Sequence, residues 1–194
     1  MEVSYSAYFL ALVAVIAIVT APLTITGNNY VVPGRSYTWT TNSGGANTLQ
    51  GIYFSVIPKY NTTLVNLDFS ASTPNPNPDS ATLYLFDENK FPDAADAGTA
   101  GSYTDLGCSS EVTGNRIFMT GCSQSLLEGV TYNFYARVDS PNLFLADQAG
   151  ELNGLWRENN ALQVYTSFSS SADFAVVENP LYGVSTTFNY TRVD

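Results

Sequence analysis

The order of apolar and polar residues divides the chain into two unlike parts. Residues Ala7 to Val19 form an unbroken apolar run, and no charged side chain occurs from Val3 to Gly34. An element that is apolar on every side must be buried against lipid or inside protein. The run therefore cannot lie exposed to water, and the remainder of the chain has to be interpreted separately.

The conformation of this run is left open by its pattern. A helix would place Phe9, Val13 and Ile16 on one apolar face, and an extended strand would have two apolar sides. The absence of Gly and Pro before Pro22 favours a helix, whereas the Val and Ile content favours a strand. We predict an N-terminal hydrophobic α-helix, with a donor strand as the alternative.

Beyond Arg35 the pattern changes to short β-like runs. Within Thr63 to Ser70, apolar Val65, Leu67 and Phe69 alternate with mostly polar neighbours, which is typical of a strand with one buried face. We predict strands at the following ranges: Tyr37 to Thr40, Gly51 to Ile57, Thr63 to Ser70, Ala81 to Phe86, Arg116 to Met119, Thr131 to Val138, Leu162 to Phe168, Phe174 to Val177 and Val184 to Thr191. About nine short strands separated by turns predict a mainly β fold, an antiparallel β-sandwich of immunoglobulin-like or jelly-roll type.

These patterns predict three parts of the chain: a hydrophobic assembly segment at 1–22, a connector at 23–35 and a β-sandwich head domain at 36–194. Composition agrees with a folded head, because 45% of residues are hydrophobic and 13% are aromatic. The net charge of −10 would repel phosphate backbones, so nucleic acid is not expected as a partner.

Catalytic chemistry finds little support in the sequence. The chain has no histidine, which removes the usual general base and every Ser-His or Cys-His pair. No nucleotide-binding glycine motif or nucleophile-elbow motif occurs. We therefore do not expect an enzyme, and we expect no cofactor.

Three kinds of residue are candidates for smaller sites. Cys108 and Cys122 are the only cysteines, and behind an export-like N-terminus they predict one disulfide. Asn61 and Asn189 each begin a glycosylation sequon. Trp39, Trp156 and the tyrosines would suit carbohydrate stacking, although core or interface positions are the more common use of such residues.

An acidic loop from Asp87 to Gly101 is the one candidate for a metal site. Asp87, Asp93 and Asp96 supply carboxylates of the kind that Ca²⁺ prefers, but their spacing does not match an EF-hand loop. A solvated acidic loop is the preferred interpretation, with calcium as the alternative.

Three functions of the apolar run compete. A secretory signal peptide would have a basic first region, whereas the only charge before the run is Glu2 and the first basic residue is Arg35. A permanent membrane span needs about 20 apolar residues and usually basic flanks. The third interpretation, burial by copies of the same protein, needs no basic flank. Its expected assembly residues are Phe9, Leu10, Leu12, Val13, Val15, Ile16, Ile18 and Val19.

The overall plan resembles type IV pilin-like subunits, especially archaeal pilins and archaellins. The resemblance lies in the apolar Val3 to Ala21, the connector Pro22 to Val32 and the β-rich remainder. It implies a structural protein of a cell-surface, extracellular filament, whose helices pack in the filament core and whose heads form the outer sheath. It also implies a helical homopolymer and contact with a membrane only before assembly. The missing basic region would follow if Met1 is the first residue after a leader is removed, and the sequence leaves open whether it is that or a start codon.

A second resemblance, to pre-peptidase C-terminal-like sandwiches, rests on Ala81 to Phe86 and Gly129 to Tyr135. It implies only an extracellular accessory fold. The sequence therefore predicts a filament subunit, with two alternatives: a donor-strand-assembled fibre subunit, or a secreted or anchored carbohydrate- or calcium-binding module.

Overall fold

The computed structural model describes residues 23–24, 32–41, 47–71, 80–113, 115–138 and 144–193. The N-terminal helix predicted within 1–22, together with its eight expected assembly residues, lies outside the described residues. The connector predicted at 23–35 is described only at 23–24 and 32–35.

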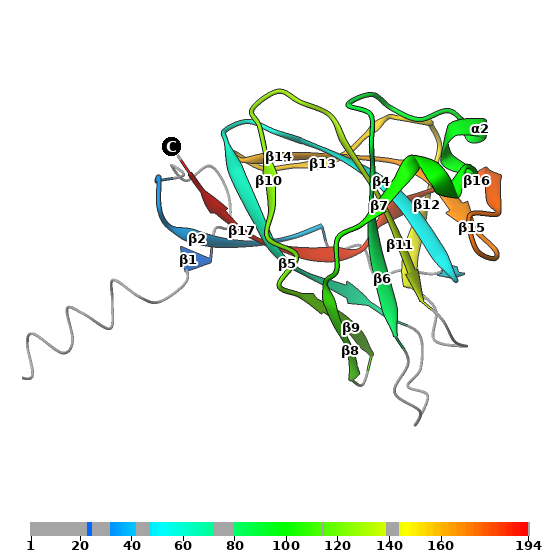
Figure 1. Cartoon of the computed structure of the whole chain (residues 1–194), viewed down its shortest axis with the longest axis horizontal. Coiled ribbons are helices and arrows are strands. Elements are labelled where there is room, and N and C mark those ends of the chain that lie inside the picture. The colour runs from blue at the N-terminus through cyan, green and yellow to red at the C-terminus, as the bar shows by residue number, and fades with distance from the viewer. Residues whose placement is uncertain are drawn as a thin grey trace, which may run out of the picture.

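The described chain is mainly β, and its strands form two sheets (Figure 1). The seven-stranded sheet has the order β1-β2-β17-β5-β9-β8, with β10 also paired to β5. Its members are β1 (Leu23–Thr24), β2 (Ser36–Thr40), β5 (Thr62–Ser70), β8 (Ser109–Thr113), β9 (Arg116–Thr120), β10 (Gln124–Leu126) and β17 (Thr186–Arg192). All pairs in it are antiparallel except β1 with β2.

The ten-stranded sheet has the order β3-β12-β16-β15-β4-β11-β6-β7, and β14 links β13 to β4. Its members are β3 (Asn47–Leu49), β4 (Gly51–Pro58), β6 (Ala81–Phe86), β7 (Tyr103–Asp105), β11 (Tyr132–Val138), β12 (Phe144–Ala149), β13 (Leu155–Glu158), β14 (Leu162–Tyr165), β15 (Ser167–Ser170) and β16 (Val176–Val184). The predicted antiparallel β-sandwich is therefore confirmed as a mainly β, two-sheet architecture.

The main core lies between the two sheets. Phe54 of β4 contacts Phe69 of β5 and Phe188 of β17, with ring centroids 6.0 and 6.2 Å apart. Leu64, Leu67 and Ile117 from the seven-stranded sheet are also buried in this cluster. Leu67 and Phe69 alternate as predicted, because one face of the strand is buried. Leu64 is buried in place of the predicted Val65, which is only half-buried, since the pairing of β5 with β17 shifts register at this point.

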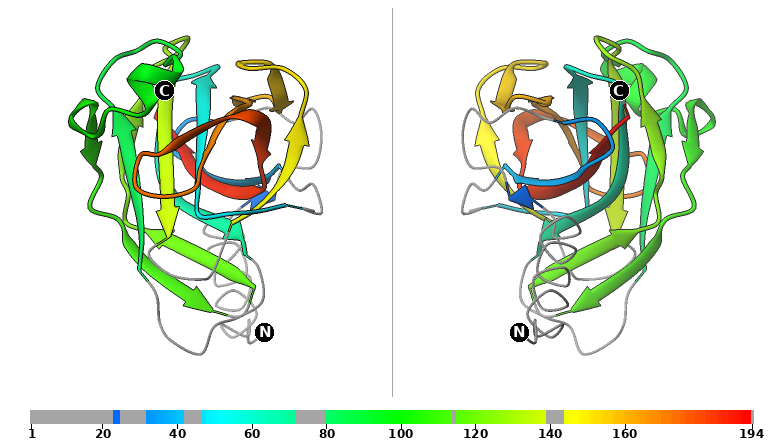
Figure 2. Two further views of the ribbon diagram at one scale, coloured as in Figure 1. Left: turned by 90° about the vertical axis from the view of Figure 1, so that its right-hand side faces the viewer. Right: turned by 90° about the vertical axis from the view of Figure 1, so that its left-hand side faces the viewer.

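A second apolar cluster covers the outer side of the ten-stranded sheet. It contains Tyr53, Phe86, Tyr103, Tyr135 and Phe168, together with Ala97 of the short helix α2 (Ala94–Ala97). A 3₁₀ turn, η1 (Ala100–Ser102), leads from α2 into β7. Figures 1 and 2 show α2 at the end of the molecule opposite to β2. This cluster was not expected from the sequence.

Two predicted strands differ from the observed ones. The range Leu162 to Phe168 divides at Thr166, whose hydroxyl donates to the Glu151 and Gly154 carbonyls and whose N–H donates to the Gly154 carbonyl at 2.9 Å. These bonds lie at an irregularity between β14 and β15. Both strands run along β4 in the same direction, and one extra residue is accommodated between the pairs Tyr165–Ser55 and Ser169–Ile52. The predicted strand at Phe174 to Val177 instead begins at Val176 and runs on to Val184 as β16.

Candidate functional site

The N-terminal part of the chain joins the head at the edge of the seven-stranded sheet. Leu23 of β1 pairs in parallel with Tyr37 of β2, and Thr24 pairs with Thr38. Because the pairing is parallel, the beginning of β1 lies on the same side as the beginning of β2. Figure 1 shows the end of β17 at this same end of the molecule. The segment before Leu23 therefore meets the head where β2 starts and β17 ends.

A turn fastens the start of β2 to the end of β17. Gly34 has φ +73°, a left-handed conformation that favours glycine, as the Pro33-Gly34 pair predicts. Its N–H donates to the Arg192 carbonyl at 2.7 Å, and the Arg192 N–H donates to the Arg35 carbonyl at 3.3 Å. The Tyr37 hydroxyl accepts from the Val32 N–H and donates to its carbonyl. Val32 is thus held by the Tyr37 hydroxyl, and Arg35 by the backbone of Arg192.

Asn61 holds two further segments at the same end. Its carbonyl accepts from the Val193 N–H at 2.9 Å, and its side-chain Oδ1 accepts from the Glu128 N–H at 3.0 Å. The Arg192 guanidinium stacks on the Tyr60 ring, 3.9 Å from its centroid. Leu127, next to Glu128, is anchored by its N–H to the Tyr132 hydroxyl at 2.9 Å. Four segments distant in the sequence therefore meet here.

We call this region the junction surface and define it by Val32, Arg35, Leu127, Arg192 and Val193. Its three apolar side chains are 46% (Val32), 57% (Leu127) and 60% (Val193) exposed. The other large hydrophobic residues that are exposed in the described chain are Leu152, which precedes β13, and Leu155, the first residue of β13. The junction surface thus combines apolar side chains with two arginines in a protein of net charge −10.

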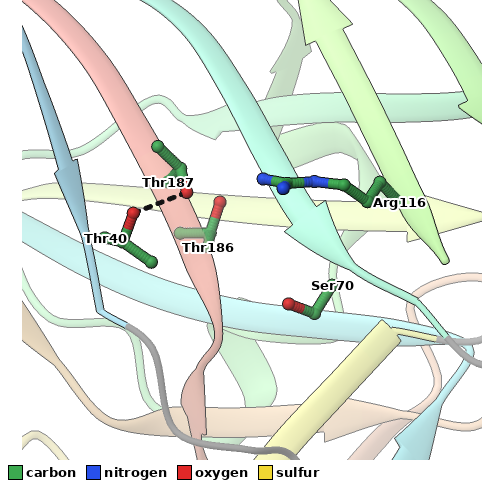
Figure 3. Close-up of a pocket in the computed structure, with 5 residues that line it drawn as sticks. All are labelled: Thr40, Ser70, Arg116, Thr186 and Thr187. Carbon is green, nitrogen blue, oxygen red and sulfur yellow. Dashed lines mark hydrogen bonds between the residues drawn. The ribbon is translucent and has the colours of Figure 1, made fainter.

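The outer face of the seven-stranded sheet carries hydroxyl and amide groups. Thr40 and Thr187 are linked by a 2.8 Å hydrogen bond, and Thr38 donates to the Asn189 Oδ1 at 2.7 Å. A hollow of about 220 Å³ at one end of this face is lined by Thr40, Ser70, Arg116, Thr186 and Thr187 (Figure 3). The Arg116 guanidinium faces this hollow and forms a two-point ion pair with Asp68. Thr40 and Thr187 therefore satisfy each other, the Thr186 hydroxyl donates to the Asp68 carbonyl at 3.2 Å, and the Asp68 carboxylate is held by Arg116.

A second hollow, of about 210 Å³, lies on the same face and includes Asn66 and Asn189. Asn189, the first residue of one sequon, is half-buried in β17. Asn61, the first residue of the other sequon, is half-buried next to the buried Thr62, whose hydroxyl donates to the Tyr60 carbonyl. Glycosylation of Asn61 and Asn189 stays a prediction.

The acidic carboxylates do not converge on one point. Asp93 caps α2 by accepting from the Asp96 N–H at 2.8 Å, and Asp87 accepts from the Thr104 hydroxyl at 2.8 Å. Lys90 bridges Glu88 and Asp96, whose hydrogen bonds raise the pKa of its ammonium. No group of three or more possible metal ligands lies together among the described residues. The alternative of a calcium site formed by Asp87, Asp93 and Asp96 is therefore not supported, because each carboxylate has a different partner.

Cys108 and Cys122 form the predicted disulfide, with Cα atoms 4.6 Å apart. The bond closes the hairpin of β8 and β9, at the free end of the seven-stranded sheet. Disulfides of this kind persist in oxidising environments such as the cell exterior. No helix among the described residues has the length and apolar character needed to cross a membrane.

Both tryptophans are partly buried and pack against the main core. Trp39 stacks on Phe188 with centroids 5.7 Å apart. Trp156 donates from Nε1 to the Val184 carbonyl at 3.2 Å, and its ring lies against Gly183, where a Cβ would approach within 2.2 Å. Arg157 stacks over Trp156 at 4.1 Å. Both rings thus pack on other parts of the head, which is the more common use of such residues.

Burial keeps the phenol groups of the tyrosines in the second cluster protonated. Tyr53 stacks on Tyr135 with centroids 4.3 Å apart. The Tyr135 hydroxyl donates to the Ser170 Oγ at 3.2 Å, whereas the hydroxyls of Tyr53 and Tyr103 have no hydrogen-bond partner in the described chain. Removal from water raises the pKa of all three phenols. They are therefore neutral packing groups at physiological pH.

Sequence reasoning missed the junction surface. Only the Pro33-Gly34 turn signal marked any part of it, because Leu127 and Val193 have no neighbours in the sequence that predict their meeting. Comparison with known proteins adds no relative: no family model matches the chain, and no characterised protein matches it.

Proposed function

We propose that this protein is a structural subunit of an extracellular filament, located at the cell surface, and that it polymerises by burying its hydrophobic N-terminal segment against neighbouring copies. Its sandwich head, of immunoglobulin-like or jelly-roll type, forms the outer part of the filament. Copies of itself are its partners, and a membrane holds it only before assembly.

One observation carries this proposal: the apolar run leads directly into a head whose own core is already filled. Phe54, Phe134 and Phe188 occupy the space between the sheets, and each is almost completely buried. The run from Ala7 to Val19 joins this head through β1 at the sheet edge. Because the head supplies its own core residues, burial of the run falls to other molecules, at a gain of roughly 25 cal/mol per Å² of apolar surface.

The same observation bears on donor-strand assembly. In that mechanism a segment of one subunit adds a strand to an exposed sheet edge of the next, and its alternate side chains fill pockets there. Here Leu64, Leu67 and Ile117 already cover the inner face of the seven-stranded sheet. Its outer face carries polar side chains such as Thr38, Thr40 and Thr187. This favours burial of the run among other runs over insertion into a head.

A secreted or membrane-anchored binding module is the other candidate function. The hollow in Figure 3 is its best support, because hydroxyls and a guanidinium suit a polar ligand. Arg116 is already paired with Asp68, however, and the tryptophans do not line the hollow. We therefore prefer the filament.

Substitution of Ile16 by aspartate tests the proposal. Ile16→Asp places a charge within the apolar run, and we expect filaments to disappear while the head unfolds at its usual urea concentration. Ser4→Asp, which adds the same charge before the run, is the matched control and should still polymerise. Electron microscopy and sedimentation report assembly. Filaments of normal abundance from Ile16→Asp would overturn the proposal.

Two measurements separate the alternatives. Mass spectrometry of the mature protein shows whether residues 1–21 are retained; their loss, together with a monomeric product, would favour the binding module. Circular dichroism of native fibres distinguishes a helix of about 20 residues from an added strand, because the head is mainly β.

A further inference from the structure

We propose that the junction surface is the place on the head where the apolar run of a neighbouring copy docks. The inference rests on the proposed function and names the contact that the function needs. Val32, Leu127 and Val193 would contact the run, with Arg35 and Arg192 beside them.

Location is the first argument. The chain outside the structure before Leu23 is 22 residues long, and it reaches the head where β2 begins. In a polymer of identical subunits whose apolar runs pack together, each head is joined to the packed runs at the start of its β2. The head surface nearest to those attachments is the junction surface, whereas Leu155, on β13, is not part of it.

The second argument is the exposed apolar surface together with its rigidity. Three apolar side chains at least 46% exposed meet at one end of the molecule, although they come from segments far apart in the sequence. Backbone hydrogen bonds from Gly34 to Arg192 and from Val193 to Asn61 hold these segments in place. A preformed apolar surface loses little conformational entropy when it binds.

Charge is the third argument. The segment before Val32 carries one charged side chain, Glu2, so a surface with Arg35 and Arg192 attracts it more than the rest of this acidic protein does. Glu128 at the rim and Asp194, the residue after Val193, contribute opposing charges. The contribution is modest because salt screens exposed charges.

The docked run belongs to a second copy because its own head covers too little of it. A run that is apolar on every side needs cover all round. Three side chains of one junction surface can cover one side, so the remaining sides require other subunits. Docking of each run on a neighbour's junction surface then links subunits head to tail, which generates an open polymer.

Mixed cysteine cross-linking tests this contact. The protein has no free cysteine, so one engineered thiol in each copy reports one distance. An Ile16→Cys protein is polymerised together with a Leu127→Cys protein, oxidised, and separated without reductant. We expect disulfide-linked dimers that join the two different variants. The control mixture replaces Leu127→Cys by Leu155→Cys, whose side chain is 49% exposed and lies away from the junction surface.

The outcomes distinguish this inference from the proposed function. If filaments form but the Leu127→Cys mixture yields no more mixed dimers than the Leu155→Cys mixture, the inference fails and the filament stands. If no mixture forms filaments, both fail. A single chain carrying Ile16→Cys and Leu127→Cys that closes only an internal disulfide would show that the run docks on its own head, and this also overturns the inference.

A second measurement avoids oxidation. Leu127→Asp should raise the concentration needed for polymerisation by about tenfold or more, the effect of losing most of one buried leucine from a contact. Leu155→Asp should leave it unchanged. Equal effects of the two variants would overturn the inference. So would unchanged polymerisation of Leu127→Asp accompanied by weaker binding of the full chain to phosphatidylglycerol vesicles, because the surface would then serve a membrane.

Discussion

The outer faces of the two sheets differ in what covers them. On the ten-stranded sheet, α2 and the segment before β16 cover Tyr53, Tyr135 and Phe168, which form a second buried cluster. On the seven-stranded sheet, Thr38, Thr40 and Thr187 point outward and hydrogen-bond to one another or to Asn189. The difference shows that the outward residues of a β-strand are apolar where another segment of the chain covers them and polar where no described segment does.

The largest difference in folding stability is expected between Phe→Ala substitutions on the two outer faces. Phe168→Ala should destabilise the head by about 3 to 5 kcal/mol, because it opens a cavity in the second cluster. Phe118→Ala should cost less than about 1 kcal/mol, since Phe118 is half-buried under Arg116 and belongs to neither buried cluster of the described residues. Urea unfolding measures both. Equal losses would show that the seven-stranded sheet is also covered in solution.

Loss of the disulfide is expected to have the second-largest effect on stability. The β8–β9 hairpin lies at the free end of the uncovered sheet, where a covalent bond replaces a covering layer. Replacing both Cys108 and Cys122 by serine should reduce the free energy of unfolding by about 3 kcal/mol, the value expected for a loop of about 15 residues. The measurement is urea unfolding without reductant, with the parent protein as reference. An unchanged midpoint would mean that strand pairing alone holds the hairpin.

High pH should reveal the second cluster through its tyrosines. Burial raises the pKa of Tyr53, Tyr103 and Tyr135, and it raises that of Tyr190 in the main core from 10.0 to about 12. Above about pH 10 the unfolded chain loses phenol protons that the folded chain keeps, so stability is complete below that pH and falls as the pH rises through about 12. Phenolate absorbance should rise in two stages, the second together with unfolding. One stage near pH 10 without unfolding would contradict this.

The smallest expected effect separates two stacked tyrosines. Tyr135→Phe removes the hydrogen bond to Ser170 and should cost about 0.5 to 1.5 kcal/mol. Tyr53→Phe removes a buried hydroxyl that has no partner in the described chain, so stability should stay equal or rise. Thermal unfolding of both variants provides the measurement. An equal loss in both would mean that the Tyr53 hydroxyl finds a hydrogen-bonding partner in solution.

Local pattern predicted the strands that have one wet face. The range Thr63 to Ser70 differs from β5 by one residue, and Ala81 to Phe86 coincides with β6. The pattern did not reveal the irregularity at Thr166 that divides β14 from β15, and it failed for strands such as β12 and β13, which have no strong alternation. A short strand forms because it pairs with another strand, and that partner is distant in the sequence, so the local pattern does not reveal it.

The candidate site was predictable only in part. Alternation does not distinguish a sheet face that another segment covers from a face that packs on the main core. The sequence therefore did not predict that Tyr135 belongs to a second buried cluster. The acidic loop could not be resolved either: whether Asp87, Asp93 and Asp96 meet depends on the turn of α2 and on Lys90, which pairs with Glu88 and Asp96.

By itself, the sequence determined the features whose cause is local. These are the alternating strands, the pairing of the only two cysteines and the presence of an apolar run that water cannot solvate. Only the tertiary structure decided which sheet face is covered, and it alone brought Val32, Leu127 and Val193 to one end of the molecule. The physical reason is that a surface is formed by chain segments that long-range hydrogen bonds bring together, such as Val193 to Asn61, and local periodicity does not encode these pairings.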